Sequence, residues 1–118
     1  MGQPINEIQE ELIEEFGLFE DWADKYEYLI DLGKKLAPMS DAFKTEENVI
    51  KGCQSRVWLH AEKQGDLVVF QADSEAIIVK GMISMLIRVL SNHTPAEILA
   101  ADLYFIEQIG MSQQLAQT

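Results

Sequence analysis

The stretch SRVWLHAEKQGDLVVFQA, residues 55–72, decides the fold, because its apolar residues change from a helical spacing to a period of two. Between Ser55 and Lys63 the side chains alternate between an apolar and a more polar face. Residues 67–72 form a second run, rich in β-branched and aromatic side chains, and Gln64-Gly65-Asp66 is typical of the turn between them. The stretch predicts an antiparallel hairpin, which is marginal alone and needs helices over one face.

Two amphipathic helices are predicted before this hairpin. Apolar residues recur at helical spacing in residues 5–17 and again in residues 21–36, and Pro38 prevents the second helix from continuing. The glutamates of the first helix lie largely opposite its apolar side, and we interpret them as a solvent-exposed face; a docking surface for a basic partner is the alternative. Residues 39–47 predict an irregular polar connection, and Asn48-Val49-Ile50 predicts a short third strand.

Further helices are predicted after the hairpin. Ser74 is placed to cap a long helix over residues 75–91, which is apolar around most of its circumference and is therefore expected to be central and buried. Thr94 and Glu97 form a capping box, and short helices continue from there to Ile109. Helices, a small antiparallel sheet of about three strands and further helices together predict one α+β domain over residues 1–118.

The charge and composition of the chain narrow the classes of partner. Its 118 residues carry a formal net charge of −11, which phosphate backbones and anionic lipids repel, so we expect neither nucleic acid nor a membrane as partner. The N-terminus lacks the basic and apolar regions of a secretory signal. The most apolar stretch, residues 76–90, is too short and too charged to span a bilayer. A single cysteine forms no internal disulfide, which fits a cytoplasmic protein.

Cys53 is the only thiol and the main candidate for a reactive residue. A lone cysteine is most often a small buried apolar residue. Here it stands in KGCQSR, residues 51–56, a polar segment between two strand signals, where a loop would present it. Lys51 and Arg56 favour the thiolate, and Gly52 permits backbone angles that turn amide donors towards sulfur. The excess of acidic residues elsewhere opposes this effect. The residues alone therefore leave open whether Cys53 is a reactive thiol or a buried structural residue.

Other kinds of reactive site lack the residues they need. A structural zinc site takes four Cys or His ligands and an iron–sulfur cluster several thiolates, whereas the chain has one cysteine and two histidines, so we expect no metal site. A hydrolase-like Cys–His pair with His60 or His93 is an alternative. The odd separation of Cys53 and His60 places them on opposite faces of a continuous strand. We interpret His60 as a half-exposed strand residue and His93 as a residue of the loop before Thr94.

Four parts of the sequence occur in the order found in one protein family. They are WADKY at residues 22–26 with LIDLG at 29–33, GCQSRVW at 52–58, DSEAIIVKG at 73–81 and TPAEI at 94–98. Together they resemble the SufE family of cysteine-desulfuration proteins, the sulfur acceptors of the Suf pathway. After Gly110 the resemblance weakens, because LAQT at residues 115–118 departs from the family's Leu-Ser/Thr-Pro-Ser-Arg segment, and we expect the family's last helix to be absent.

The resemblance implies a function. Cys53 would accept a persulfide sulfur from a pyridoxal-phosphate cysteine desulfurase, stimulate that enzyme, and pass the sulfur to an iron–sulfur scaffold complex. The fold would be similar to that of iron–sulfur scaffold proteins, and the protein would be an accessory factor without a cofactor of its own rather than a stand-alone enzyme. The residues expected to shape the loop or support the thiolate are Lys51, Gly52, Gln54, Ser55 and Arg56. A non-covalent regulator with a structural Cys53 is the alternative.

Overall fold

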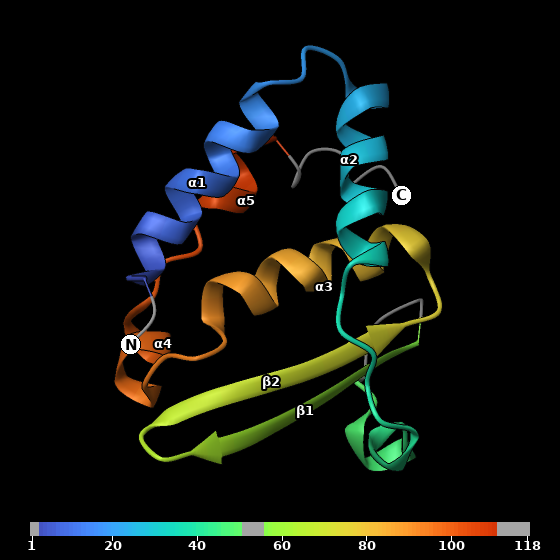
Figure 1. Ribbon diagram of the computed structural model, residues 1–118, viewed down its shortest axis with the longest axis vertical. Helices are drawn as coiled ribbons and strands as arrows, with labels where there is room; N and C mark the ends of the chain where they lie inside the picture. The colour runs from blue at the N-terminus through green and yellow to red at the C-terminus, as the bar shows by residue number, and fades with distance from the viewer. Residues whose placement is uncertain (1–2, 51–55, 111–118) are drawn as a thin grey trace.

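The computed structural model describes residues 3–50 and 56–110. Its elements are, in order, α1 (Ile5–Gly17), α2 (Trp22–Lys34), the 3-10 helices η1 (Asp41–Phe43) and η2 (Glu46–Asn48), β1 (Val57–Gln64), β2 (Leu67–Ser74), α3 (Ile77–Leu90), α4 (Pro95–Ala100) and α5 (Phe105–Gln108). In Figure 1 the β1–β2 hairpin lies on one side of α3, and α1 and α2 lie on the other. The predicted α+β class, with an antiparallel sheet against helices, is confirmed.

The hairpin has the predicted strands and turn. β1 and β2 pair from Val57 with Ser74 to Gln64 with Leu67, which leaves Gly65 and Asp66 as a two-residue turn. Gly65 has a φ of +63°, as the first central residue of such turns requires. The third strand expected at residues 48–50 is reduced to one bridge between Val49 and Trp58, so the sheet of the described residues has two strands. The reason is that η2 continues to Asn48.

The connection at residues 39–47 is more regular than predicted. It contains η1 and the first part of η2. Ser40 caps η1 by accepting a hydrogen bond from the backbone N–H of Ala42 at 3.3 Å. The side chain of Asn48 donates to the carbonyl oxygen of Phe43 at 2.7 Å and joins the two short helices. Polar side chains that bond the nearby backbone therefore order this connection.

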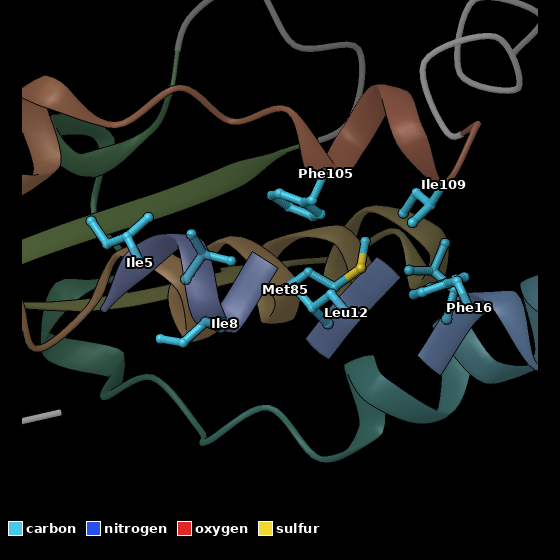
Figure 2. Close-up of a cluster of buried hydrophobic side chains, with 9 residues drawn as sticks. Ile5, Ile8, Leu12, Phe16, Met85, Phe105 and Ile109 are labelled. Carbon is cyan, nitrogen blue, oxygen red and sulfur yellow. The ribbon is translucent and has the colours of Figure 1, made fainter. Parts of the chain in front are cut away.

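The main core lies between α1, α2, α3 and α5, and Figure 2 shows side chains of this core gathered in one apolar cluster. Its fully buried apolar members are Leu12, Phe16, Leu29, Met85, Val89 and Phe105. Trp22, Tyr26 and Met82 pack against this cluster from partly buried positions, as their helical spacing predicts. A smaller cluster of Val57, Ala72 and Ile83 joins the hairpin to α3.

Two glycines allow α2 and α3 to cross in close contact. A Cβ atom on Gly81 would lie 2.3 Å from the carbonyl oxygen of Leu29, and one on Gly33 would lie 2.8 Å from the backbone nitrogen of Gly81. Neither position can hold a larger residue unless a helix moves. Gly81, which in the sequence only interrupts an apolar run, is therefore part of a helix–helix contact.

The prediction that Ser74 caps the long helix is wrong. α3 begins at Ile77, Ala76 occupies its N-cap position, and no side chain caps it. Ser74 is instead the buried last residue of β2, where its hydroxyl donates to the carbonyl oxygen of Arg56. The predicted capping box of Thr94 and Glu97 is confirmed at α4.

Two glutamates of the face of α1 that was predicted to be solvent-exposed are only partly exposed and are paired with α3. Arg88 of α3 donates to both carboxylate oxygens of Glu15, at 2.7 and 3.1 Å, and to Glu11 at 3.2 Å. The hydrogen bonds from Arg88 hold the pKa of Glu15 below its ordinary value. Burial and the hydrogen bond to Glu15 raise the pKa of Tyr28 to about 12. Only Glu14 and the remaining exposed glutamates of α1 fit the prediction.

Candidate functional site

Most of the predicted site residues fall in one short segment. Cys53 and its neighbours Lys51, Gly52, Gln54 and Ser55 lie outside the described residues. Arg56 is described and is exposed, as expected of the end of a polar loop. The structure thus describes the frame to which the segment is attached, and the chemistry of the site is argued from that frame.

Hydrogen bonds fix both flanks of the Cys53 segment at one end of the hairpin. The backbone N–H of Ile50 donates to the carbonyl oxygen of Val57 at 2.9 Å, and Val49 forms a bridge with Trp58. The hydroxyl of Ser74 donates to the carbonyl oxygen of Arg56 at 2.8 Å. In sequence, the segment that contains Cys53 is therefore flanked by two points of the chain that are bonded to each other. The loop position of Cys53 itself stays a prediction, because residues 51–55 lie outside the described residues.

An apolar groove of about 170 Å³ lies between the hairpin and α3, beside this frame. The residues that line it are Ile50, Val57, Leu59, Phe70, Ala72, Ile83, Leu86, Ile87 and Leu90. Ile50 and Val57 flank the Cys53 segment, and Ile50 and Leu59 keep 39% and 38% of their surface exposed. The groove therefore offers an apolar surface, still open to solvent, beside the two residues that bracket the Cys53 segment.

Arg56 is engaged by a carboxylate. Its guanidinium donates to Glu46 at 2.7 Å and lies 6.0 Å from the centre of the Trp58 ring. The side chains of Arg56 and Glu46 are 45% and 80% exposed, so water and salt screen this ion pair and it contributes little to stability. The predicted support of a thiolate by Arg56 remains a prediction.

Two lysines lie at the same end of the hairpin as Arg56. The Nζ atom of Lys44 is 2.8 Å from the carboxylate of Asp73, and that of Lys80 is 3.6 Å from it. Burial alone would raise the pKa of Asp73, but the hydrogen bond from Lys44, with that from the backbone of Ser74, holds it below its ordinary value. Asp73 is thus a carboxylate that ties the connection and α3 to the end of β2.

The two histidines have structural surroundings, as we interpreted them. His60 is a half-exposed residue of β1 whose ring stacks on Phe43, with 3.8 Å between the ring centres, and it does not line the groove. His93 lies in the loop before α4 and is 4% exposed. Its Nδ1 is 2.9 Å from the carbonyl oxygen of Ser91, and its Nε2 is 2.7 Å from that of Gln3. Both nitrogens of His93 are therefore engaged by the backbone.

Sequence reasoning missed the groove and the Asp73–Ser74 corner. A weak signal for the groove exists, because small Ala72 pairs with Leu59 across the hairpin and leaves space on that face. For the corner the only signal is a pair of polar residues at a strand end, which equally predicts a helix cap.

The family model for SufE, described as an Fe-S metabolism associated domain, matches residues 10–118. This chain belongs to the SufE family. It is 34% identical over 112 residues to an uncharacterized SufE-like protein of Rhizobium meliloti (strain 1021), a match that covers 91% of this chain and 80% of that protein. A SufE-like protein of Rhizobium etli is 35% identical over 112 residues, with 91% and 76% covered.

SufE membership confirms the resemblance that the four sequence segments carry, and it indicates a sulfur-transfer role alongside a cysteine desulfurase. It also agrees with an accessory protein rather than a stand-alone enzyme. Within residues 3–50 and 56–110, every helix is too short or too polar to cross a bilayer.

Proposed function

We propose that this SufE protein is a sulfur acceptor and carrier, in which Cys53 takes a persulfide sulfur from a cysteine desulfurase and delivers it for iron–sulfur cluster assembly. The observation that carries the proposal is the hydrogen bond between Ile50 and Val57, which joins the two flanks of the Cys53 segment. A loop fixed at its base on a rigid hairpin is suited to present a reactive residue to a larger protein.

The proposed transfer is a thiol exchange. The Cys53 thiolate attacks the outer sulfur of the desulfurase persulfide, so that a new S–S bond forms while the S–S bond within the desulfurase breaks. The desulfurase cysteine leaves as a thiolate, and the proton of the outer sulfur stays on that sulfur. No oxidant or reductant is consumed. Since the chain has one cysteine, it contains no second thiol to convert the persulfide into an internal disulfide.

The groove supports a protected persulfide. A terminal sulfur held against Ile50, Val57 or Leu59 would be shielded from thiols in solution. In this proposal Gly52, Gln54 and Ser55 shape the loop, while Lys51 and Arg56 favour the anionic sulfur. The protein carries no cofactor, because pyridoxal phosphate belongs to the desulfurase, and the next acceptor is an iron–sulfur scaffold complex.

Mass spectrometry after incubation with desulfurase and cysteine tests the proposal. We expect the wild-type protein to gain the mass of one sulfur atom, which a reductant removes. Cys53→Ser should gain none and should no longer stimulate the desulfurase, while its circular dichroism matches that of the wild type. A loaded Cys53→Ser protein would overturn the proposal. Stimulation by Cys53→Ser without any gain in mass would instead establish the non-covalent regulator.

A further inference from the structure

Ser74 lies where the Cys53 segment rejoins the sheet. The pair of Val57 and Ser74 is the last of the β1–β2 ladder, so the backbone of Arg56 has no ladder partner. The Ser74 hydroxyl takes the place of that partner, donating to the carbonyl oxygen of Arg56 at 2.8 Å and accepting from the N–H of Ala76 at 3.2 Å. Ser74 is only 7% exposed, so this arrangement is shielded from competing water.

Asp73 holds Ser74 in place. Its carboxylate accepts a hydrogen bond from the backbone N–H of Ser74 at 2.8 Å. The same carboxylate is bound by Lys44 from the connection before the Cys53 segment, and by Lys80 from the first turns of α3. The backbone of Ser74 is therefore held by a carboxylate that two other parts of the chain bind, the connection through Lys44 and α3 through Lys80.

We propose, on the basis of the sulfur-acceptor function above, that Ser74 is a positioning residue for Cys53. Arg56 is three residues after Cys53 and directly before β1, so a bond to its carbonyl oxygen restrains the direction from which the backbone enters β1. Attack on a persulfide held in another protein requires the two sulfurs to be aligned, and a displacement of about 1 Å lowers the rate of such an oriented step by up to about 100-fold. Loss of the hydroxyl releases this constraint without touching the thiol.

The test compares two serines that are almost equally buried. Ser74→Ala removes the bond to Arg56. The matched control, Ser91→Ala, removes a hydroxyl that is 6% exposed and accepts from the N–H of Phe70 at 3.0 Å, further along β2 from the Cys53 segment. Ser74→Thr restores a hydroxyl at the same position.

The measured quantities are the maximal rate of sulfur transfer from a loaded desulfurase and the acceptor concentration that gives half of it. We expect Ser74→Ala to lower the maximal rate about five- to tenfold with an unchanged half-saturating concentration. Ser91→Ala should match the wild type, and Ser74→Thr should recover most of the rate. The reaction of Cys53 with a small soluble disulfide should change less than about twofold in all variants, because a small reagent needs no alignment with the frame.

A second variant tests the same role in case the Ser74→Ala protein does not fold. Lys44→Gln keeps the hydroxyl but weakens its support through Asp73, and we expect a loss of about twofold in the same maximal rate. The role of Ser74 would be overturned if Ser74→Ala and Lys44→Gln both transferred sulfur at the wild-type rate, or if Ser74→Ala and Ser91→Ala lost equal shares of the rate. The carrier function would still stand in either case, as long as the wild-type protein gains sulfur. A wild-type protein that takes up no sulfur would remove the carrier function, and this inference with it.

Discussion

The two sides of α3 differ in how completely they are packed. Towards α1 and α5, Leu12, Val89 and Phe105 have no exposed surface. Towards the hairpin, Ile83 joins two buried residues of the sheet, and the apolar groove beside them stays open. A closed core gains the full free energy of burial and close packing, whereas an open groove keeps apolar surface in contact with water. Stability is therefore concentrated on the helical side of α3, and the candidate site lies on the sheet side.

The largest expected effect tests this division directly. Leu12→Ala should lower the free energy of unfolding by about 3 kcal/mol, because it opens a cavity in the closed core. Leu59→Ala removes the same atoms from a residue that is already 38% exposed at the groove, and should cost only about 1 to 1.5 kcal/mol. Urea titration of both variants measures the difference.

The same two variants should affect sulfur transfer in the reverse order, with Leu59→Ala having the larger effect. Folded Leu12→Ala protein should accept sulfur at the wild-type rate, whereas Leu59→Ala should hold its persulfide for a shorter time in the presence of a soluble thiol. Equal costs in stability, together with equal persulfide lifetimes, would contradict the division between the two sides of α3.

A smaller loss is expected at the crossing of α2 and α3. Gly81→Ala places a methyl group 2.3 Å from the carbonyl oxygen of Leu29 and should lower the free energy of unfolding by about 2 kcal/mol. Gly17→Ala is the control, because nothing lies within 4 Å of the added methyl group at the end of α1. Thermal unfolding of both variants measures the effect. A Gly81→Ala protein as stable as Gly17→Ala would show that this crossing is looser than described.

The smallest of the three effects concerns Arg88, at the edge of the closed core. Arg88→Met removes half-exposed ion pairs to Glu11 and Glu15 and should lower the free energy of unfolding by about 1 kcal/mol near neutral pH. The pKa of Glu15 is lowered in the folded protein, so its contribution is present above the ordinary value of 4.5 and disappears as the pH falls through the folded pKa. The difference between Arg88→Met and the wild type should therefore shrink below about pH 4.5.

Urea titrations of both proteins at a series of pH values measure this difference. Tyr28→Phe is the control, because it keeps the ion pairs while removing the hydrogen bond that Tyr28 donates to Glu15. A difference between Arg88→Met and the wild type that stays constant into acid would mean that the ion pairs do not stabilise the fold.

Features decided by neighbours along the chain were predictable. The turn at Gly65 and the capping box of Thr94 and Glu97 were predicted from a few adjacent residues, because the hydrogen bonds and backbone angles involved are local. The local sequence around Cys53 made it a candidate, but only the family resemblance favoured a reactive thiol over a buried one, and the role of Cys53 stays a prediction. Ser74 was misjudged because a serine at a strand end is also typical of a helix cap, and its bond to Arg56 depends on a residue 18 positions earlier in the chain.

The sequence by itself determined the α+β class, the hairpin, most helix positions and the SufE resemblance, and it made Cys53 the candidate for the reactive residue. The tertiary structure alone decided that Arg88 bonds glutamates 73 and 77 residues away, that Gly81 contacts Leu29, and that an apolar groove opens beside Ile50. The physical reason is the distance along the chain over which each interaction acts. Periodicity and capping act within a few residues, whereas ion pairs, helix crossings and grooves depend on which distant surfaces the folded chain brings together.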